Sequence, residues 1–445
     1  MAGLLAIAFA FAVTVDGLVP AVPARAPATT TNLEQRYGIT ATLNVGGGIL
    51  RAVERVTLTN RSAHDINYIN LSVLPRAFGY FAFTGPLTIG DTAASKTWTT
   101  HTNLRVSLGR WLAPGQTATL RIPFKLTIGS SGGAFTARLS RDRGVISFGE
   151  WFPILSREHD SYGVGDPQVT RTAQQIRLDL TTTTTLPRHA VACPGLRSAP
   201  KVSGRNWVCR TELVRDFSFV VNPRFHMTTR RADGVLIKVF TESVGGGVTA
   251  DKIQSALGRL NDLYGMYPWP DLVVAEVGAD GGFSMEYPQA IHMTRSKVTD
   301  TYVLYHEVAH QWFYAQLGND QMRAPWLDEG FADFTARRLM GIGENQCSGR
   351  EVDSTVFAWP AGLTSGGDWQ SCDGYFHTVF YKGTEFLTKV RVAMGSNAFF
   401  ASLRAYLNEH RYGLITTRSL LDFLRTRTDA NLLPIYRQYL DAYDP

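Results

Sequence analysis

The chain has 445 residues, which is too long for one ordinary hydrophobic core and suits two domains. Its composition is that of a globular protein, with 44% apolar, 11% aromatic and 18% charged residues. The net charge of +6 comes without a Lys/Arg block dense enough for a nucleic-acid groove. We therefore expect a mildly basic, solvated surface and no nucleic-acid partner.

An apolar run at residues 4–15 opens the chain and is broken by Asp16. Its 12 residues are few for a transmembrane helix but suit the core of a signal peptide. Ala24-Arg25-Ala26 resembles a cleavage site, so we expect residues 1–26 to be a signal peptide. The mature protein would be secreted or extracytoplasmic, without stable membrane insertion. An uncleaved N-terminal membrane anchor is the alternative.

Residues 33–230 are predicted to form a β-sandwich or saddle. The stretches 39–43, 53–59 and 119–124 alternate apolar and polar residues or are β-branched, as half-buried strands do. The threonine run 181–185 is expected to be an exposed strand. Trp151 is expected in the core.

Four cysteines fall into two local couples, Cys193 with Cys209 and Cys347 with Cys372. Their spacing fits no zinc ribbon, so sulfur ligation of a metal is not expected. An exported protein favours two disulfides in these pairs, with reduced structural cysteines as the alternative.

Residues 235–445 have a different pattern, in which strands come first and helices follow, as in an α+β domain. The stretches 235–240 and 272–277 are predicted strands. After a glycine-rich turn, a helix is expected from Thr249, as N-cap, to about Tyr264.

The sequence His306-Glu307-Val308-Ala309-His310 carries the chemistry of this second half. Two histidines four residues apart lie on one face of a helix, so both imidazoles can bind one ion. Zinc in a catalytic site takes three protein ligands and keeps a fourth position for water. We expect one zinc per chain, held by His306, His310 and Glu329, with Glu307 as the base toward that water.

Asp333 follows Glu329 by four residues and shares its helical face. Metal-bound imidazoles usually donate their other N–H to a carboxylate, and Asp333 is expected to accept such a hydrogen bond.

His306-Glu307-x-x-His310, 18 further residues and then Glu329 is a pattern that resembles the aminopeptidase N family of gluzincin metallopeptidases. Residues 326–332 are similar to its W-L-x-E-G-F-A segment. Tyr381-Lys382-Gly383 is similar to its Y-x-K-G segment, and residues 283–287 are similar to its G-x-M-E-N segment, with Phe283 and Tyr287 departing from it.

The resemblance implies an N-terminal β domain followed by a thermolysin-like α+β catalytic domain, without the helical C-terminal domain of larger relatives. It implies that Tyr381 donates to the oxyanion, and that Met285 and Glu286 bind the substrate, with Glu286 holding its free amino group. The expected function is a zinc aminopeptidase acting on peptides or proteins. A zinc endopeptidase with an open cleft, an epoxide-opening hydrolase and a non-catalytic zinc-binding protein are the alternatives.

Overall fold

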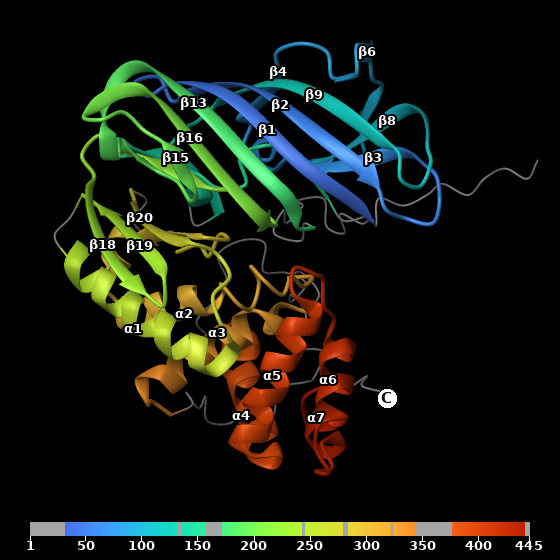
Figure 1. Ribbon diagram of the computed structural model, residues 1–445, viewed down its shortest axis with the longest axis vertical. Helices are drawn as coiled ribbons and strands as arrows, with labels where there is room; N and C mark the ends of the chain where they lie inside the picture. Colours follow the sequence, from blue (N-terminus) through green and yellow to red (C-terminus); the bar gives the residue numbers. More distant parts are fainter. Residues whose placement is uncertain are drawn as a thin grey trace, which may run out of the picture.

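The computed structural model describes residues 32–130, 135–156, 171–242, 245–278, 284–321, 324–343 and 376–440. Three sheets built from the first half lie on one side, and a smaller sheet with the helices lies on the other (Figure 1). The predicted fold class, a β domain followed by an α+β domain, is confirmed. The expected signal peptide and the couple Cys347–Cys372 lie outside the described residues.

A nine-stranded sheet forms the outer layer of the β half, in the order β15-β16-β13-β1-β2-β9-β5-β6, with β4 paired to β9. Strands β1 and β2 bury every second residue, as the alternating sequence predicts for a sheet with one solvated face. The threonine run lies in the long β13, whose last threonines are exposed as expected. The strands are β1 (Leu33–Asn44), β2 (Ile49–Asn60), β4 (Phe81–Phe83), β5 (Thr88–Ile89), β6 (Thr92–Ala93), β9 (Thr117–Thr127), β13 (Ala173–Pro187), β15 (Leu196–Ser198) and β16 (Ser203–Val214).

Two four-stranded sheets complete the β half, in the orders β12-β3-β8-β7 and β10-β11-β17-β14. Trp151 is fully buried between layers, with its ring 6.4 Å from Phe124 of the large sheet and 5.4 Å from Phe219 of the second small sheet. The prediction that Trp151 is a core residue is therefore confirmed. The strands are β3 (Ile66–Ser72), β7 (Lys96–Trp98), β8 (Asn103–Leu112), β10 (Leu139–Asp142), β11 (Val145–Phe148), β12 (Ile154–Leu155), β14 (Val191–Ala192) and β17 (Phe219–Val221).

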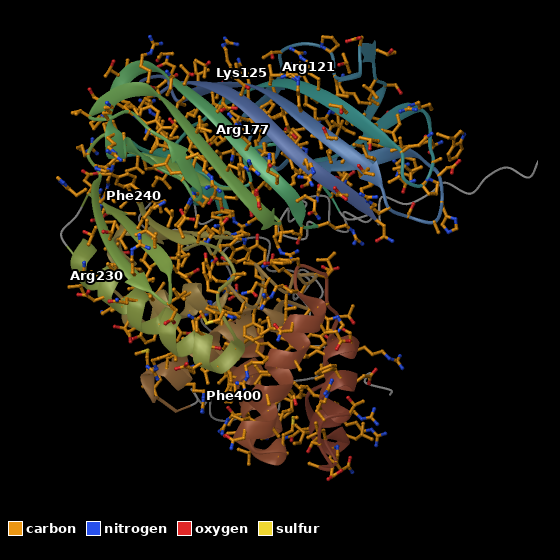
Figure 2. All side chains as sticks on the ribbon, in the orientation of Figure 1. Arg121, Lys125, Arg177, Arg230, Phe240 and Phe400 are labelled. Carbon is orange, nitrogen blue, oxygen red and sulfur yellow. A yellow bond between two sulfur atoms is a disulfide. The ribbon has the colours of Figure 1, made fainter. Side chains whose placement is uncertain are left out.

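Basic side chains gather on the solvated face of the large sheet. Arg55 lies directly opposite Arg121, and Arg51 lies opposite Lys125. Figure 2 shows Arg121, Lys125 and Arg177 on the sheet side of the molecule, away from the helices. Like charges directly opposite each other on neighbouring strands are destabilising.

The fourth sheet begins with a hairpin of β18 (His226–Ala232) and β19 (Val235–Thr241). Asp233 and Gly234 both have positive φ, which is the backbone that a two-residue hairpin turn requires. Strands β20 (Asp271–Val277) and β21 (Ala290–Thr294) continue the sheet in parallel. Every residue of β20 is buried, as expected for a central parallel strand. The expected boundary between the two domains, between residues 230 and 235, falls at the end of β18 and in the turn of this hairpin.

Helices pack against this sheet and then against one another. The predicted first helix was placed too late, because α1 (Gly246–Tyr264) begins within the glycine run and Gly245, not Thr249, is its N-cap. Thr249 is buried inside the helix and donates to the carbonyl of Val298. Among the described residues, no helix is long and apolar enough to cross a membrane. The other helices are α2 (Thr301–Ala309), α3 (Glu329–Met340), α4 (Lys382–Met394), α5 (Ser396–His410), α6 (Thr417–Arg425) and α7 (Leu433–Tyr439), and a π-helical turn, Phe376–Tyr381, leads into α4.

Candidate metal centre

Helix α2 positions the two histidines. Asp300 caps its N-terminus by accepting from the backbone N–H groups of Tyr302 and Val303. His306 lies in the last turn, and His310 is the C-cap residue that follows Ala309 and still has helical backbone angles. Both are buried, so their ring nitrogens point into the protein and need partners there.

Helix α3 brings the third ligand. Asp328 is its N-cap and accepts from the backbone N–H of Glu329, the first helical residue. The side chain of Glu329 thereby leaves the start of α3 toward α2. Glu329 Oε2 lies 2.9 Å from His306 Nε2 and 3.4 Å from His310 Nε2.

Three donor atoms converge on one point. The two Nε2 atoms of His306 and His310 lie 3.1 Å apart, and the ligand atoms of the two histidines and Glu329 all lie within 4.8 Å of one another. Zinc bonds of about 2.0–2.1 Å in a tetrahedral site hold ligand atoms about 3.3–3.4 Å apart. His310 Nδ1 donates to the carbonyl of Phe313 at 3.1 Å, which leaves the lone pair of its Nε2 free for a metal. The donor set therefore fits zinc.

The charges around this point also favour a cation. Burial lowers the pKa of His310, but the negative charges of Glu286 and Glu329 outweigh it and raise that pKa to about 10. Burial raises the pKa of Glu329, but His310 and His306 hold it well below its ordinary value. Without a metal, the carboxylates thus recruit a proton onto His310. A divalent cation can take the place of that proton.

Glu307 lies beside the three ligands. Burial, and then the negative charge of Glu286, raise its pKa well above the ordinary value. Its Oε2 is buried without a hydrogen-bond partner among the described residues. A buried acceptor of this kind is costly unless another molecule supplies the missing hydrogen bond. The carboxyl group is therefore available to a water or substrate at the metal centre.

Met285 and Glu286 lie next to the sheet edge, where Met285 exchanges two backbone hydrogen bonds with His292 of β21. Glu286 is buried, burial raises its pKa, and the charge of His310 lowers it. The segment is tied to the histidine segment by Gln311, whose amide donates to the carbonyl of Glu286 at 3.3 Å and accepts from Gln289 at 2.9 Å. The sequence did not predict this role of Gln311. The side chain is fully buried next to His310, and its amide joins the Glu286 segment to the histidine segment.

Tyr287 replaces the asparagine of the similar family segment and turns into the β half. It is fully buried, and its ring lies 4.8 Å from that of His292. A Cβ atom on Gly149 would lie 1.9 Å from the Tyr287 hydroxyl oxygen, so only glycine fits there. The larger side chain is thus accommodated by the β half.

The π-helical turn lies against the centre through Phe380. Its ring stacks on that of His306, with centroids 5.3 Å apart and planes 2° from parallel. The Y-x-K-G segment has one residue between tyrosine and lysine, so Phe380 occupies the tyrosine position and Tyr381 comes one residue later. The Tyr381 ring lies 5.2 Å from the guanidinium of Arg337. Phe380 was missed in the sequence, although counting the motif from Lys382 would have found it.

Asp333 does not accept from an imidazole, contrary to expectation. Its carboxylate is fully buried and accepts hydrogen bonds from Tyr302, Arg337 and Thr384. His306 Nδ1 is buried and has no hydrogen-bond partner among the described residues. The physical reason is that Tyr302, one turn before His306 on α2, lies between the helices and donates its hydroxyl hydrogen to Asp333 instead.

Comparisons with known proteins find similar sequences and a similar fold. Residues 284–439 match the Peptidase family M1 domain. Aminopeptidase N of Lactobacillus delbrueckii subsp. lactis is 26% identical over 266 residues, 52% of this chain and 31% of the relative. Aminopeptidase N of Lactobacillus helveticus is 26% identical over 267 residues, with the same coverage. The chain thus spans about a third of the length of these relatives.

The M1 zinc metallopeptidase of Deinococcus radiodurans has the same fold. One crystal structure of it covers 94% of this chain and 95% of its own, with a TM-score of 0.65 and 17% identity. A mutant of that protein bound to a Tyr-Ser-Ala substrate matches with a TM-score of 0.64 and 18% identity.

Two histidines on one helix and a glutamate at the start of a second helix define the gluzincin class of metallopeptidase. Together with the match of residues 284–439 to the Peptidase family M1 domain, they make this chain similar to the aminopeptidase N relatives of that class.

Proposed function

We propose that this protein is a zinc-dependent peptidase that removes residues from the free N-termini of peptides. The observation that carries the proposal is the convergence of His306, His310 and Glu329 on one point beside the carboxyl groups of Glu307 and Glu286. One zinc ion per chain would be held by the three ligands. When bound, zinc polarises the scissile carbonyl and lowers the pKa of water in the site.

Glu307 is proposed as the general base and acid. It takes a proton from the attacking water and passes it to the amine that leaves. This work needs a carboxylate within hydrogen-bond reach of the water and a pKa brought toward neutrality. The buried Oε2 and the raised pKa of Glu307 support that role.

Glu286 is proposed to bind the ammonium group of the substrate. Its burial in the segment beside β21, within electrostatic range of His310, places a negative charge close to the metal ligands. An ammonium held there would put the first peptide bond next to the centre. The aminopeptidase N relatives and the tripeptide bound to the Deinococcus protein point to the same substrate class.

The test compares one peptide with a free and with an N-acetylated terminus, using wild type, Glu286→Gln and Glu286→Ala. Wild type should cleave only the free peptide, and both variants should lose at least about tenfold in kcat/KM, since a buried charged hydrogen bond is worth about 1.5–3 kcal/mol. Equal wild-type rates on the two peptides would instead indicate an endopeptidase. Cleavage of an epoxide without any peptide cleavage would indicate the other hydrolase class.

The similar family segment implies that Tyr381 stabilises the oxyanion, whereas the spacing of that segment gives the tyrosine position to Phe380. Because Phe380 holds the position against His306, we expect Tyr381→Phe to change kcat by less than about threefold, whereas losing an oxyanion donor costs about 100-fold or more. A loss on that larger scale would assign the donor role to Tyr381.

We also propose that the protein is exported, with cleavage near Ala26, from the composition of residues 1–26. The disulfide Cys193–Cys209 supports an oxidising compartment. The intact mass of protein from the outside of its native cells, with and without reduction and alkylation, tests both points. A mass that starts at Met1 with four alkylatable thiols before reduction would contradict them.

A further inference from the structure

The two histidine ligands of the centre are held by different means. His310 is oriented by a hydrogen bond from Nδ1 to the carbonyl of Phe313. His306 has no such bond, because its buried Nδ1 lacks a partner among the described residues. Metal-bound imidazoles normally have their second nitrogen engaged, since that bond fixes the ring and its tautomer. Among the residues that the structure describes, a contact other than a hydrogen bond therefore has to fix the His306 ring.

Two aromatic rings adjoin the His306 ring. The Phe380 ring is stacked parallel to it at 5.3 Å, and the Tyr302 ring lies 6.1 Å away at 34°. Phe380 is buried at 8% exposure and His306 at 7%, so water does not compete for these contacts. Packed aromatic rings at such separations are worth about 0.5–1.5 kcal/mol beyond the area they bury.

Asp333 links Tyr302 to α4, the helix that begins two residues after Phe380. The Tyr302 hydroxyl donates to its carboxylate, and Thr384 of α4 donates to it at 2.7 Å. Arg337 of α3 donates to it at 2.8 Å. One buried carboxylate thus links α2, α3 and the helix that follows Phe380.

We propose that Tyr302 and Phe380 form an aromatic clamp, anchored by Asp333, that positions His306 as a metal ligand, since no described residue makes a hydrogen bond to its Nδ1. The clamp acts on the metal through His306, so both residues are positioning residues. The proposal builds on the zinc site of the proposed function but does not depend on peptide cleavage, because its consequence is the affinity for the metal.

The test measures the zinc dissociation constant by competition with a chromophoric chelator, for wild type, Phe380→Leu, Phe380→Tyr and Tyr302→Leu. Loss of either ring should weaken zinc binding about 10–100-fold, as loss of other groups that orient metal ligands does. Phe380→Tyr keeps the ring and should stay within about threefold of wild type. The d–d absorption of the cobalt-substituted protein should change in the two leucine variants and stay unchanged in Phe380→Tyr.

Phe400→Leu is the matched control. Phe400, which is labelled in Figure 2, is buried at 5% exposure, and its ring lies 5.9 Å from that of Tyr264 on α1. This substitution removes a similar side chain and should leave zinc affinity unchanged. The thermal unfolding of each metal-free variant separates a loss of fold from a loss of affinity. If Phe380→Leu does not fold, Tyr302→Leu carries the test.

Zinc affinity within about twofold of wild type in folded Phe380→Leu and Tyr302→Leu would overturn the clamp, since orienting groups contribute tenfold or more. So would an equal loss in Phe400→Leu. A wild-type protein that binds zinc and shows the clamp effect but cleaves no peptide would refute the proposed function and leave the clamp standing.

Discussion

Glu54 is a buried carboxyl group in the β half that the chemistry of the metal centre does not use. It lies on β2 at 0% exposure, and neither of its side-chain oxygens has a hydrogen-bond partner among the described residues. Burial raises its pKa well above the ordinary value. The folded protein therefore keeps a proton on Glu54 at a pH where the unfolded chain has released it.

The sign of the pH dependence follows from that difference. Below its unfolded pKa of about 4.3, Glu54 adds no pH-dependent loss of stability. As pH rises above this value, the free energy of unfolding falls by up to about 1.4 kcal/mol per pH unit until the folded pKa is reached. We expect Glu54→Met to be more stable than wild type at pH 8, with the difference shrinking toward pH 4. Urea unfolding at several pH values measures it.

Exposed Glu409, whose side chain is 60% exposed, gives the control variant Glu409→Met, which should follow the wild-type pH dependence. A Glu54→Met variant that parallels wild type from pH 4 to pH 8 would show that folding does not raise the pKa of Glu54.

Single residues of the centre were predictable where a motif fixes their spacing. His306 and His310 were expected on one helix and Glu329 on another, and the structure brings the three together. The hydrogen-bond partner of Asp333 was not predictable, because it depends on whether the Tyr302 hydroxyl or an imidazole lies within hydrogen-bond distance of the carboxylate. Such competition between neighbours is decided by packing, which a helical spacing does not reveal.

Helices α3 and α4 cross at two glycines of the motif segments. A Cβ atom on Gly383 would lie 2.9 Å from the Cα of Gly330, which is closer than real side chains approach a backbone. Gly330 follows the ligand Glu329, and Gly383 follows Phe380 by three residues. The contact between glycines therefore sets how closely the π-helical turn approaches the metal centre.

We expect Gly383→Ala to push the two helices apart. Overpacking of this kind costs about 1–3 kcal/mol, and it should also weaken zinc binding because Glu329 and Phe380 would shift with their helices. Thermal unfolding and chelator competition measure the two effects. Gly247→Ala in α1 is the control, since a Cβ there meets nothing within 4 Å, and it should stabilise the fold by about 0.5–1 kcal/mol. A Gly383→Ala variant as stable and as tight for zinc as wild type would contradict the account.

Whole elements were predicted where the hydrophobic pattern is regular. The strands expected at 39–43, 53–59 and 119–124 lie within β1, β2 and β9, and those at 235–240 and 272–277 lie within β19 and β20. The start of α1 was missed because glycine is a poor helix former, and its first residues become helical only through packing on the fourth sheet. The hairpin of β18 and β19 was also missed, although its Asp-Gly turn is a recognisable signal.

At the scale of the whole molecule, the two halves are joined by buried and partly buried hydrogen bonds as well as by the core. The indole of Trp269 donates to the carbonyl of Glu212 at 2.9 Å, and Thr172 donates to the carbonyl of Tyr412 at 2.7 Å. Asp271 at the start of β20 accepts from the backbone of Gly195, within the loop closed by Cys193–Cys209. These contacts join residues far apart in the sequence, so no local pattern predicts them.

The β half contributes to the site by holding the Glu286 segment. Gly149 makes room for Tyr287, and Arg138 lowers the pKa of Glu286, against the larger effect of burial. Substrate recognition is thus proposed to depend on both halves, whereas the metal ligands come from the second half alone.

The central claim, a zinc centre with Glu307 as its base, is tested most directly by measuring bound zinc and peptide turnover together in wild type and Glu307→Gln. We predict one zinc per chain in both proteins and a loss of at least about 100-fold in kcat for the variant, the usual scale of acid–base catalysis. Wild-type turnover in Glu307→Gln with zinc still bound would contradict the role of Glu307, and a wild-type protein that binds no zinc would contradict the centre itself.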